Sequence, residues 1–326
     1  MLLLTQSEIR SLLNLDDLLD AVSGAMADIS AGRASQPPRI GASVEGVGFL
    51  GAMAAYCPSA NALASKLVSV FPGNHEKGLP SHQAVIVVFD PATGQAIAML
   101  DGTEITATRT AAASALSVKL LSRPESSVLA ILGTGVQAES HAKAVTRVRD
   151  FKEIRIASRS LQAAEKLANR MKAELDLPFR AVSSWAEATQ GADVVCATTH
   201  PHDPVVRREW LSPGAHVTSV GLSAEGREVD AETVRQARIF VEQRSTATLP
   251  FSAGSNDLRL PFEEGAFTLN SLTEIGEVVL GVKPGRQSAE EITLYKSVGV
   301  GVQDAAAASL VLRRARELGV GKSAEL

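Results

Sequence analysis

An apolar run that ends in two closely spaced glycines constrains the fold of this chain more than any other feature. Residues 128–132 read Val-Leu-Ala-Ile-Leu, Gly133 and Gly135 follow, and a helical pattern continues to Val148. A buried parallel strand has such a run, and a phosphate-binding turn needs glycines where the backbone folds tightly and approaches an anion. The Gly-x-Gly-x-x-Ala pattern also occurs in ordinary turns. A second strand-like run at 153–157 favours the dinucleotide-binding interpretation, because it follows at the expected spacing.

The residues after this second run bear on which dinucleotide is bound. In such folds this point meets the adenosine ribose, where an acidic residue is usual for NAD and an arginine suits the 2′-phosphate of NADP. The chain has Ser158 and Arg159 there, and no carboxylate. We therefore expect an enzyme that uses NADPH, although the same residues permit NADH.

Composition excludes several classes of partner. The chain has 326 residues, 45% of them hydrophobic and 21% charged, and a net charge of −4. It lacks the basic excess that attracts nucleic acid or anionic membranes, so neither is an expected partner. The apolar start Met1–Leu4 is too short for a signal peptide, and no apolar run is long enough to span a bilayer. With only Cys57 and Cys196, both in apolar surroundings, we expect a cytoplasmic protein with free buried thiols.

Two successive patterns predict two domains. A helical pattern over 7–31 followed by strand-like alternation indicates an α+β domain, and the regular alternation of strands and helices from about 125 to 245 indicates a doubly wound parallel sheet. We expect an α/β protein: an α+β substrate and dimerisation domain at 1–115, to which a C-terminal helix at 303–326 returns, and a Rossmann-like NAD(P)-binding domain at 116–302. The expected strands are 40–47, 49–56, 64–71, 84–89 and 96–100 in the first domain and 128–132, 153–157, 179–183, 193–197, 215–220 and 238–242 in the second, and an Ala-rich helix at 103–121 joins the two.

Histidine gives little support for a metal site. His200 and His202 stand in a Pro-containing loop beside Asp203, and His-x-His there is more often plain loop. No Cys or His pair has the helical spacing of metal ligands. We expect no metal.

Two cations stand in unfavourable local settings. Arg109 lies early in the Ala-rich helix, where the helix dipole disfavours a cation unless an anion binds beside it. The alternative is an exposed arginine whose stem follows the apolar stripe of that helix. Lys66 shares a strand face with Val68 and Val70, so it is either a buried lysine with a partner and a depressed pKa, or a solvated lysine on an edge strand. Arg39, after two prolines, is uninformative by itself.

Several stretches together resemble the ornithine cyclodeaminase/μ-crystallin family. They cover nearly the whole chain in order, so the resemblance is specific. The matching stretches are Gln36–Arg39, Ser65–Val68, Pro80–Ala84, Leu100–Thr103, Ile105–Ala113, Gly133–Ala138, Gly191–Val194, Pro213–His216 and Tyr295–Gly299.

The resemblance implies a homodimer whose first domain pairs with its mate, and a Rossmann-like cofactor domain. It also implies that Arg39, Lys66 and Arg109 gather around a substrate carboxylate that faces the nicotinamide. Ser223 or His82 could hydrogen-bond near a ring nitrogen, and Lys66 could donate a proton. Alternatively, Ser223 is a turn serine and His82 a polar residue at a strand start. The cofactor contacts expected on this basis come from Thr110, Gly133, Gly135, Val136, Gln137, Ser158, Arg159 and Thr198.

One position bears on which branch of the family the chain resembles. In the cyclodeaminase branch an aspartate serves the ornithine amine, whereas Ser223 stands at that point here, as a serine does in the ketimine reductases. A neutral hydroxyl is a poor replacement for a carboxylate that deprotonates an amine. We expect an NAD(P)H-dependent reductase of cyclic α-imino acids, converting Δ1-pyrroline-2-carboxylate to L-proline and Δ1-piperideine-2-carboxylate to L-pipecolate. The alternatives are an ornithine cyclodeaminase that recruits Glu225, an alanine-type dehydrogenase, and a non-enzymatic ligand-binding crystallin.

Overall fold

A computed structural model describes residues 1–325, the side chain of His75 excepted. The described residues divide into two compact units. Unit 1 consists of Met1–Arg109 and the chain from Gly299 onward, and unit 2 is Thr110–Val298. The sequence predicted domain boundaries at 115/116 and 302/303, whereas the two units of the structure are divided at 109/110 and 298/299. The helix at 102–121 therefore contributes its residues up to Arg109 to unit 1 and the rest to unit 2.

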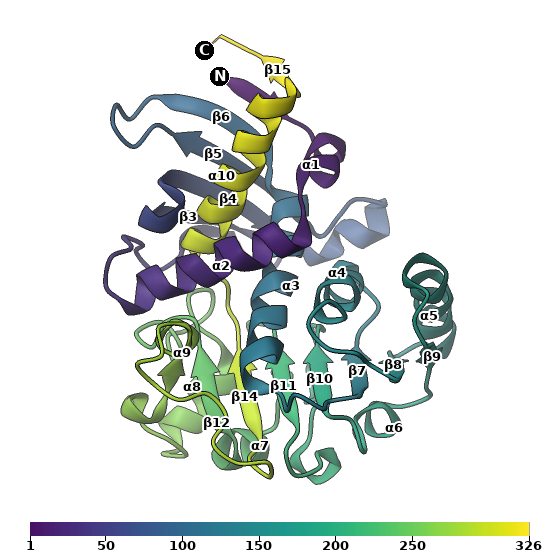
Figure 1. The fold of residues 1–326 in the computed structure, drawn as a ribbon. Coiled ribbons are helices and arrows are strands. Elements are labelled where there is room, and N and C mark those ends of the chain that lie inside the picture. The colour runs from purple at the N-terminus through teal and green to yellow at the C-terminus, as the bar shows by residue number, and fades with distance from the viewer. Residues whose placement is uncertain (326) are drawn as a thin grey trace. The chain divides into compact units, whose positions relative to one another are not determined.

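Unit 1 is built on a mixed sheet covered by helices on one face. The C-terminal helix packs on the central strands and on the long N-terminal helix, and both lie over the same face of the sheet (Figure 1). The strands, in sheet order, are β15 (Lys322–Ser323), β1 (Leu2–Leu4), β6 (Ala96–Asp101), β5 (His82–Phe89), β4 (Ala62–Val70), β3 (Gly48–Cys57) and β2 (Ile40–Val44). The helices are α1 (Gln6–Leu12), α2 (Leu15–Ser30), the 3-10 helices η1 (Pro58–Ala60) and η2 (Pro72–Lys77), α3 (Gly102–Leu121) and α10 (Gly301–Leu318).

The helical pattern over 7–31 forms two helices where one was expected. Asn14 ends the run because its side chain accepts hydrogen bonds from the backbone N–H groups of Asp16 and Asp17, and so caps α2. The short strands β1 and β15 were not expected. Each is two or three residues long, too short to show an alternating pattern.

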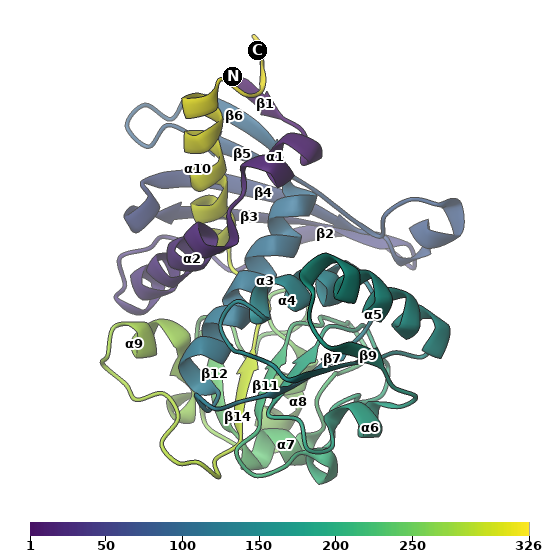
Figure 2. The same cartoon turned by 45° about the vertical axis from the view of Figure 1, so that its right-hand side comes forward.

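Alternation along the central strands separates a covered face from an open one. On β4, Ala62, Ala64, Lys66 and Val68 are buried beneath α10, while Leu67 is 40% exposed on the other face. Figure 2 shows α10 and α2 together on one side of these strands. The open face also carries Leu50 on β3 and Met99 on β6.

Unit 2 is a parallel sheet with the expected doubly wound order. The chain passes from the centre to one edge and then returns to the other side of its first strand, so the order reverses between β7 and β10. This confirms the predicted fold class. In sheet order the strands are β13 (Thr273–Glu274), β12 (Arg238–Val241), β14 (Thr293–Lys296), β11 (His216–Ser219), β10 (Val194–Ala197), β7 (Val128–Leu132), β8 (Glu153–Ala157) and β9 (Phe179–Ala181). The helices are α4 (Val136–Val145), α5 (Leu161–Leu175), α6 (Trp185–Thr189), α7 (Ala231–Gln236), α8 (Asn256–Glu263), α9 (Ile275–Val279), η3 (Arg208–Trp210) and η4 (Leu269–Ser271).

Strand β14 was missed from the sequence although it lies between β11 and β12. Its residues read Thr-Leu-Tyr-Lys and all are buried. Two of them are polar, so the segment shows neither an apolar run nor clean alternation.

Both cysteines are free and buried, as expected. Among the described residues, no helix is long and apolar enough to cross a membrane.

Candidate functional site

The turn after β7 has the geometry of a phosphate-binding loop. Gly133 has φ +123°, and a Cβ at this position would lie 2.8 Å from Oγ1 of Thr198 and 2.9 Å from its carbonyl oxygen. Gly135 is the N-cap of α4 and has no side chain to satisfy the first N–H groups of that helix. Such N–H groups, together with the helix dipole, favour a bound anion. The turn therefore fits the pyrophosphate of a dinucleotide.

Other residues expected at the cofactor lie after β10, in α4 and in α3. Thr198 follows β10, and its hydroxyl donates to the carbonyl of Leu132 at 2.8 Å, which ties the ends of β10 and β7 together. Val136 is 66% exposed at the start of α4. Gln137 follows it, and Thr110 is buried in α3. The structure thus brings Gly133 and Thr198 into direct contact.

Ser158 and Arg159 follow β8, as expected for residues near a ribose. The Ser158 hydroxyl donates to the carbonyl of Ser160 at 2.7 Å and accepts from its backbone N–H at 3.1 Å. Ser160 in turn caps α5. Arg159 is exposed, so its guanidinium is available to an incoming phosphate.

A buried cluster of charges lies beneath α10 in unit 1. Nζ of Lys66 is 2.7 Å from Oδ2 of Asp304, and Nε of Arg109 donates to Oδ1 of the same carboxylate at 2.9 Å. Nη1 of Arg109 also donates to Oε1 of Gln303 at 2.8 Å. Lys66 is only 2% exposed, and its strand lies between β3 and β5, so it is not a solvated edge lysine.

Arg39 lies beside this cluster, and Gly299 lies next to both Arg39 and Arg109. Nη2 of Arg39 donates to the Gly299 carbonyl at 3.4 Å. A Cβ on Gly299, whose φ is +75°, would lie 2.8 Å from Nη1 of Arg109. The cations that the family resemblance predicted to gather, Arg39, Lys66 and Arg109, therefore lie together at one place in unit 1.

The cluster changes the protonation of its members. Burial, and then the facing Arg109 guanidinium, lower the pKa of Lys66 to about 7, against the opposing effect of Asp304. Burial acts to raise the pKa of Asp304, but Arg109 and Lys66 outweigh it and hold that pKa below its usual range. Near neutral pH both the protonated and the neutral form of Lys66 are therefore populated.

Asp304 and Gln303 were not expected at this site from the sequence. Both lie in the first turn of α10, a helix that is otherwise rich in alanine, and both are buried. An acidic residue among small apolar residues was the available signal, since a buried carboxylate needs a cationic partner.

His82 and Ser223 were also expected near the substrate. His82 is exposed at the start of β5, on the same sheet face as Lys66. Ser223 lies in unit 2, and its hydroxyl accepts from the N–H groups of Glu225 at 3.3 Å and Gly226 at 3.0 Å. The Ser223 oxygen thus stabilises a turn, while its hydroxyl proton can still be donated. Glu225 is exposed.

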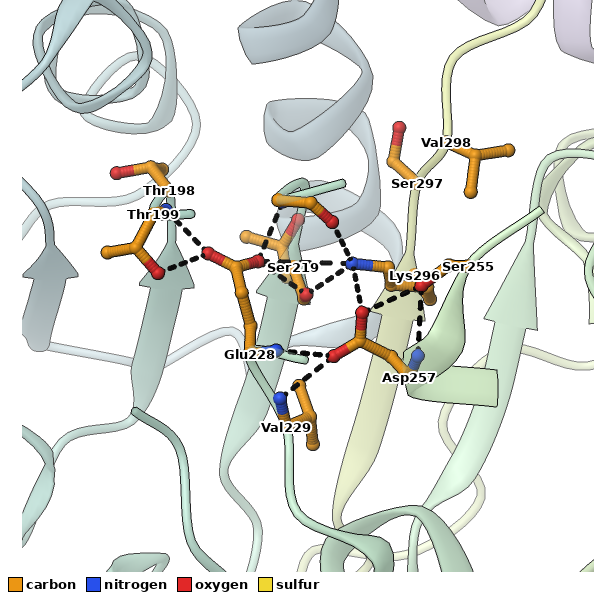
Figure 3. Close-up of polar contacts among 12 residues, drawn as sticks. Thr198, Thr199, Ser219, Glu228, Val229, Ser255, Asp257, Lys296, Ser297 and Val298 are labelled. Carbon is orange, nitrogen blue, oxygen red and sulfur yellow. Dashed lines mark hydrogen bonds and ion pairs between the residues drawn. The ribbon is translucent and has the colours of Figure 1, made fainter. Parts of the chain in front are cut away.

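A second buried ion network, also missed from the sequence, lies at the carboxyl end of the unit 2 sheet (Figure 3). Nζ of Lys296 donates to the Gly221 carbonyl at 2.6 Å and to Oγ of Ser219 at 2.9 Å, and lies 2.9 Å from Oδ2 of Asp257. Glu228 contacts the same group, with its Oε2 3.9 Å from Nζ. The short, partly polar strand that carries Lys296 gave no local signal for this network.

Among the described residues, no group of three or more His, Cys, Asp or Glu side chains could hold a metal ion.

Known proteins resemble this chain over nearly its full length. The Ornithine cyclodeaminase/mu-crystallin family profile matches residues 1–319. Ketimine reductase mu-crystallin of Mus musculus is 43% identical over 265 residues, which are 81% of this chain and 80% of that protein. The structure of Thermococcus litoralis Δ1-pyrroline-2-carboxylate reductase with NADH and L-proline has a TM-score of 0.94 at 37% identity, and covers 99% of this chain and 100% of its own. An archaeal alanine dehydrogenase dimer with bound NAD has a TM-score of 0.92 at 32% identity, and covers 100% and 99%.

Proposed function

Because the chain belongs to the ornithine cyclodeaminase/μ-crystallin family and is a nicotinamide-dependent oxidoreductase, we propose that it reduces cyclic α-imino acids with NADPH. The proposed substrate is Δ1-pyrroline-2-carboxylate, which gives L-proline, and its six-membered homologue would give L-pipecolate. One observation carries the proposal: a buried lysine with a pKa of about 7 lies in a cluster with Arg109 and Arg39. The two guanidinium groups can bind a carboxylate, and the lysine can donate a proton to an imine nitrogen.

In the proposed mechanism, the residues of unit 1 bind the substrate and transfer a proton to it. The guanidinium groups of Arg39 and Arg109 hold the substrate carboxylate, since planar guanidinium groups pair well with carboxylates. Asp304 contacts both Arg109 and Lys66 and so orients their side chains. Lys66 keeps a proton close to the imine nitrogen, and Ser223 or His82 donates a further hydrogen bond there.

The residues of unit 2 position the dinucleotide. The turn at Gly133 and Gly135 binds the pyrophosphate, with further contacts from Thr110, Val136, Gln137 and Thr198. Ser158 and Arg159 bind the 2′-phosphate. The nicotinamide, when bound, supplies the hydride for the imine carbon.

The proposal also includes a preference for NADPH over NADH. The Thermococcus litoralis structure contains NADH, and the archaeal alanine dehydrogenase contains NAD. Arg159 supports NADPH in this chain, because its exposed guanidinium follows β8, where the ribose phosphate is expected. NADH stays open as the second cofactor.

The experiment follows oxidation of NADPH by absorbance with Δ1-pyrroline-2-carboxylate, alongside ammonia release from L-ornithine. Rapid oxidation without ammonia release is the expected result. Ammonia and proline from ornithine without net loss of NADPH would contradict the proposal and identify a cyclodeaminase, with Glu225 as the candidate base.

Alanine dehydrogenation is the second candidate, because the archaeal alanine dehydrogenase matches the whole chain at 32% identity. Such an enzyme would aminate pyruvate with free ammonia. The same assay with pyruvate and ammonia therefore separates the two candidates, since the imine reductase needs no ammonia.

We also propose that the enzyme is a homodimer that pairs through the open face of the unit 1 sheet. Leu50, Leu67 and Met99 share that face and are 47%, 40% and 37% exposed. Large apolar side chains that lie exposed on one face of a sheet are typical of an interface. The cytoplasmic location stays a prediction from the sequence.

A further inference from the structure

Glu228 is buried, and four hydrogen-bond donors converge on its side chain. Its Oε1 accepts from the backbone N–H of Thr199 at 2.5 Å and from the Thr199 hydroxyl at 2.8 Å. Its Oε2 accepts from Oγ of Ser219 and from the N–H of Gly221, both at 2.7 Å. Each of these contacts presents a hydrogen to the carboxylate. Each carboxylate oxygen thus accepts from one backbone N–H, which can only donate, and from one hydroxyl, and this set of four donors suits a carboxylate.

The network around Glu228 carries more negative than positive charge. Asp257 pairs with Lys296 at 2.9 Å and also accepts from the backbone N–H groups of Glu228 and Val229. Burial acts to raise the pKa of Asp257, but Lys296 outweighs it and holds that pKa below its usual range. Contacts among the described residues therefore set one ammonium against two carboxylates. Partial desolvation lowers the pKa of nearby His200, although part of its side chain is exposed, so the ring is mostly neutral at pH 7.

This charge lies at the edge of the sheet where a dinucleotide binds. Thr199 follows β10, Gly221 follows β11, and Lys296 ends β14. These strands form the half of the doubly wound sheet on the far side of the switch point from β8. Dinucleotides bind outside the carboxyl ends of the strands, with one nucleotide over each half. The adenosine half belongs near β8, so the nicotinamide half belongs over β10, β11 and β14.

We propose that Glu228 is a positioning residue that favours the oxidised, positively charged form of the bound nicotinamide. This inference rests on the proposed function. The reduced ring is neutral, and loss of a hydride with its two electrons to the imine carbon leaves the ring with one positive charge, while the imine nitrogen takes a proton. A buried negative charge at the edge of the ring's site stabilises the product of that step. The Glu228 side chain also holds the backbone of Thr199 and Gly221 in place at this edge of the sheet, since it accepts from the N–H group of each.

The test is the ratio of the dissociation constants of NADP+ and NADPH, measured on the full-length protein by calorimetry. Glu228→Gln is expected to weaken NADP+ roughly three- to tenfold more than NADPH, the effect of a unit charge over about 10 Å in a partly solvated site. A tenfold change in this ratio equals about 30 mV in the potential of the bound two-electron couple.

Asp193→Asn is the matched control. Asp193 accepts from the backbone N–H groups of Ser127 at 2.8 Å and Val128 at 3.0 Å and pairs with Arg123, but it precedes β10 at the amino end of the same sheet. Its loss removes the same charge from the opposite edge, so the ratio should not change. Glu228→Asp keeps the charge and should return the ratio toward that of the unmodified protein.

Three results would overturn the inference: equal weakening of both nucleotides by Glu228→Gln, the same ratio change in the control, or no recovery in Glu228→Asp. If Glu228→Gln does not fold, Asp257→Asn removes a negative charge from the same network and must shift the ratio in the same direction. An unmodified protein that binds neither nucleotide, nor NADH nor NAD+, would instead contradict the proposed function. The two failures are therefore distinguishable.

Discussion

Lys66 is a buried ammonium whose charge depends on its neighbours, and this makes the proposed activity depend on pH. Its pKa is lowered to about 7, so the protonated form is lost as pH rises through that value. If Lys66 supplies the proton, kcat/KM for imine reduction should fall above about pH 7. Lys66→Met should lower kcat/KM by roughly 10²–10⁴-fold, the range for general acid catalysis.

The control for this prediction is Lys66→Arg, which keeps a positive charge that does not titrate in this range. If kcat/KM still falls above about pH 7 in Lys66→Arg, the titrating group is the substrate imine or another residue. An unchanged profile in both variants would contradict a role for Lys66 as the proton donor.

Asp304 balances the cations of the same cluster, and its removal should destabilise the protein. Asp304→Asn would leave Lys66 and Arg109 buried without their shared carboxylate, at a cost of about 3–5 kcal/mol in the free energy of unfolding. Because a bound carboxylate can replace the missing charge, added L-proline should recover part of this loss. Glu317→Gln, on the exposed side of the same helix, should change stability by less than about 0.5 kcal/mol. Denaturant unfolding with and without proline measures both effects, and no loss in Asp304→Asn would refute the role.

Arg159 tests the cofactor preference. Arg159→Ala should weaken NADPH by about ten- to a hundredfold, the effect of one lost charge-assisted contact, and should leave NADH nearly unchanged. Arg170→Ala is the control, because Arg170 is an exposed arginine of α5 that pairs with Glu139. If Arg159→Ala weakens the binding of both cofactors equally, or of neither, Arg159 does not bind the 2′-phosphate.

At the scale of elements, the junction of β7 and α4 separates a glycine needed for the fold from one needed for the ligand. Gly133 has φ +123° and contacts Thr198, whereas Gly135 has φ −82° and no atom lies within 4 Å of its added Cβ. Gly133→Ala should lower stability by about 1–3 kcal/mol, the usual cost of a strained backbone. Gly135→Ala should lower the stability of the ligand-free protein by less than about 1 kcal/mol, because its backbone is unstrained and alanine is only a poorer N-cap than glycine.

Both glycine variants should weaken dinucleotide binding, because the proposed pyrophosphate site needs close approach of the backbone. Thermal unfolding without ligand and calorimetric titration with NADPH measure the two effects separately. A Gly135→Ala variant that binds NADPH with undiminished affinity would place the pyrophosphate elsewhere.

At the scale of the whole molecule, the open sheet face predicts the oligomeric state. Leu67→Glu places a charge in the middle of that face, next to Ala52 and Val85 on the neighbouring strands, and should convert the proposed dimer to monomers. Leu318→Glu is the control, since Leu318 is 59% exposed at the end of α10, away from the sheet's open face. Light scattering coupled to size exclusion gives the mass of each variant. A dimer that survives Leu67→Glu would contradict this interface.

The sequence by itself determined the elements with a clear period. The strand, glycine turn and helix at 128–148 and the alternation after it predicted the doubly wound sheet, because a buried parallel strand needs an apolar run and its turn needs glycine. The sequence also singled out Lys66 and Arg109, since a cation in an apolar setting requires a partner.

Only the tertiary structure decided which groups are those partners. Asp304 lies 238 residues from Lys66 along the chain, and Lys296 lies on a strand too polar and short to be recognised. Local pattern reports the period of an element and says nothing of which distant element packs on it. The pairing of Lys66 with Asp304 and of Lys296 with Asp257 follows from sheet order and from the return of α10, which no local spacing contains.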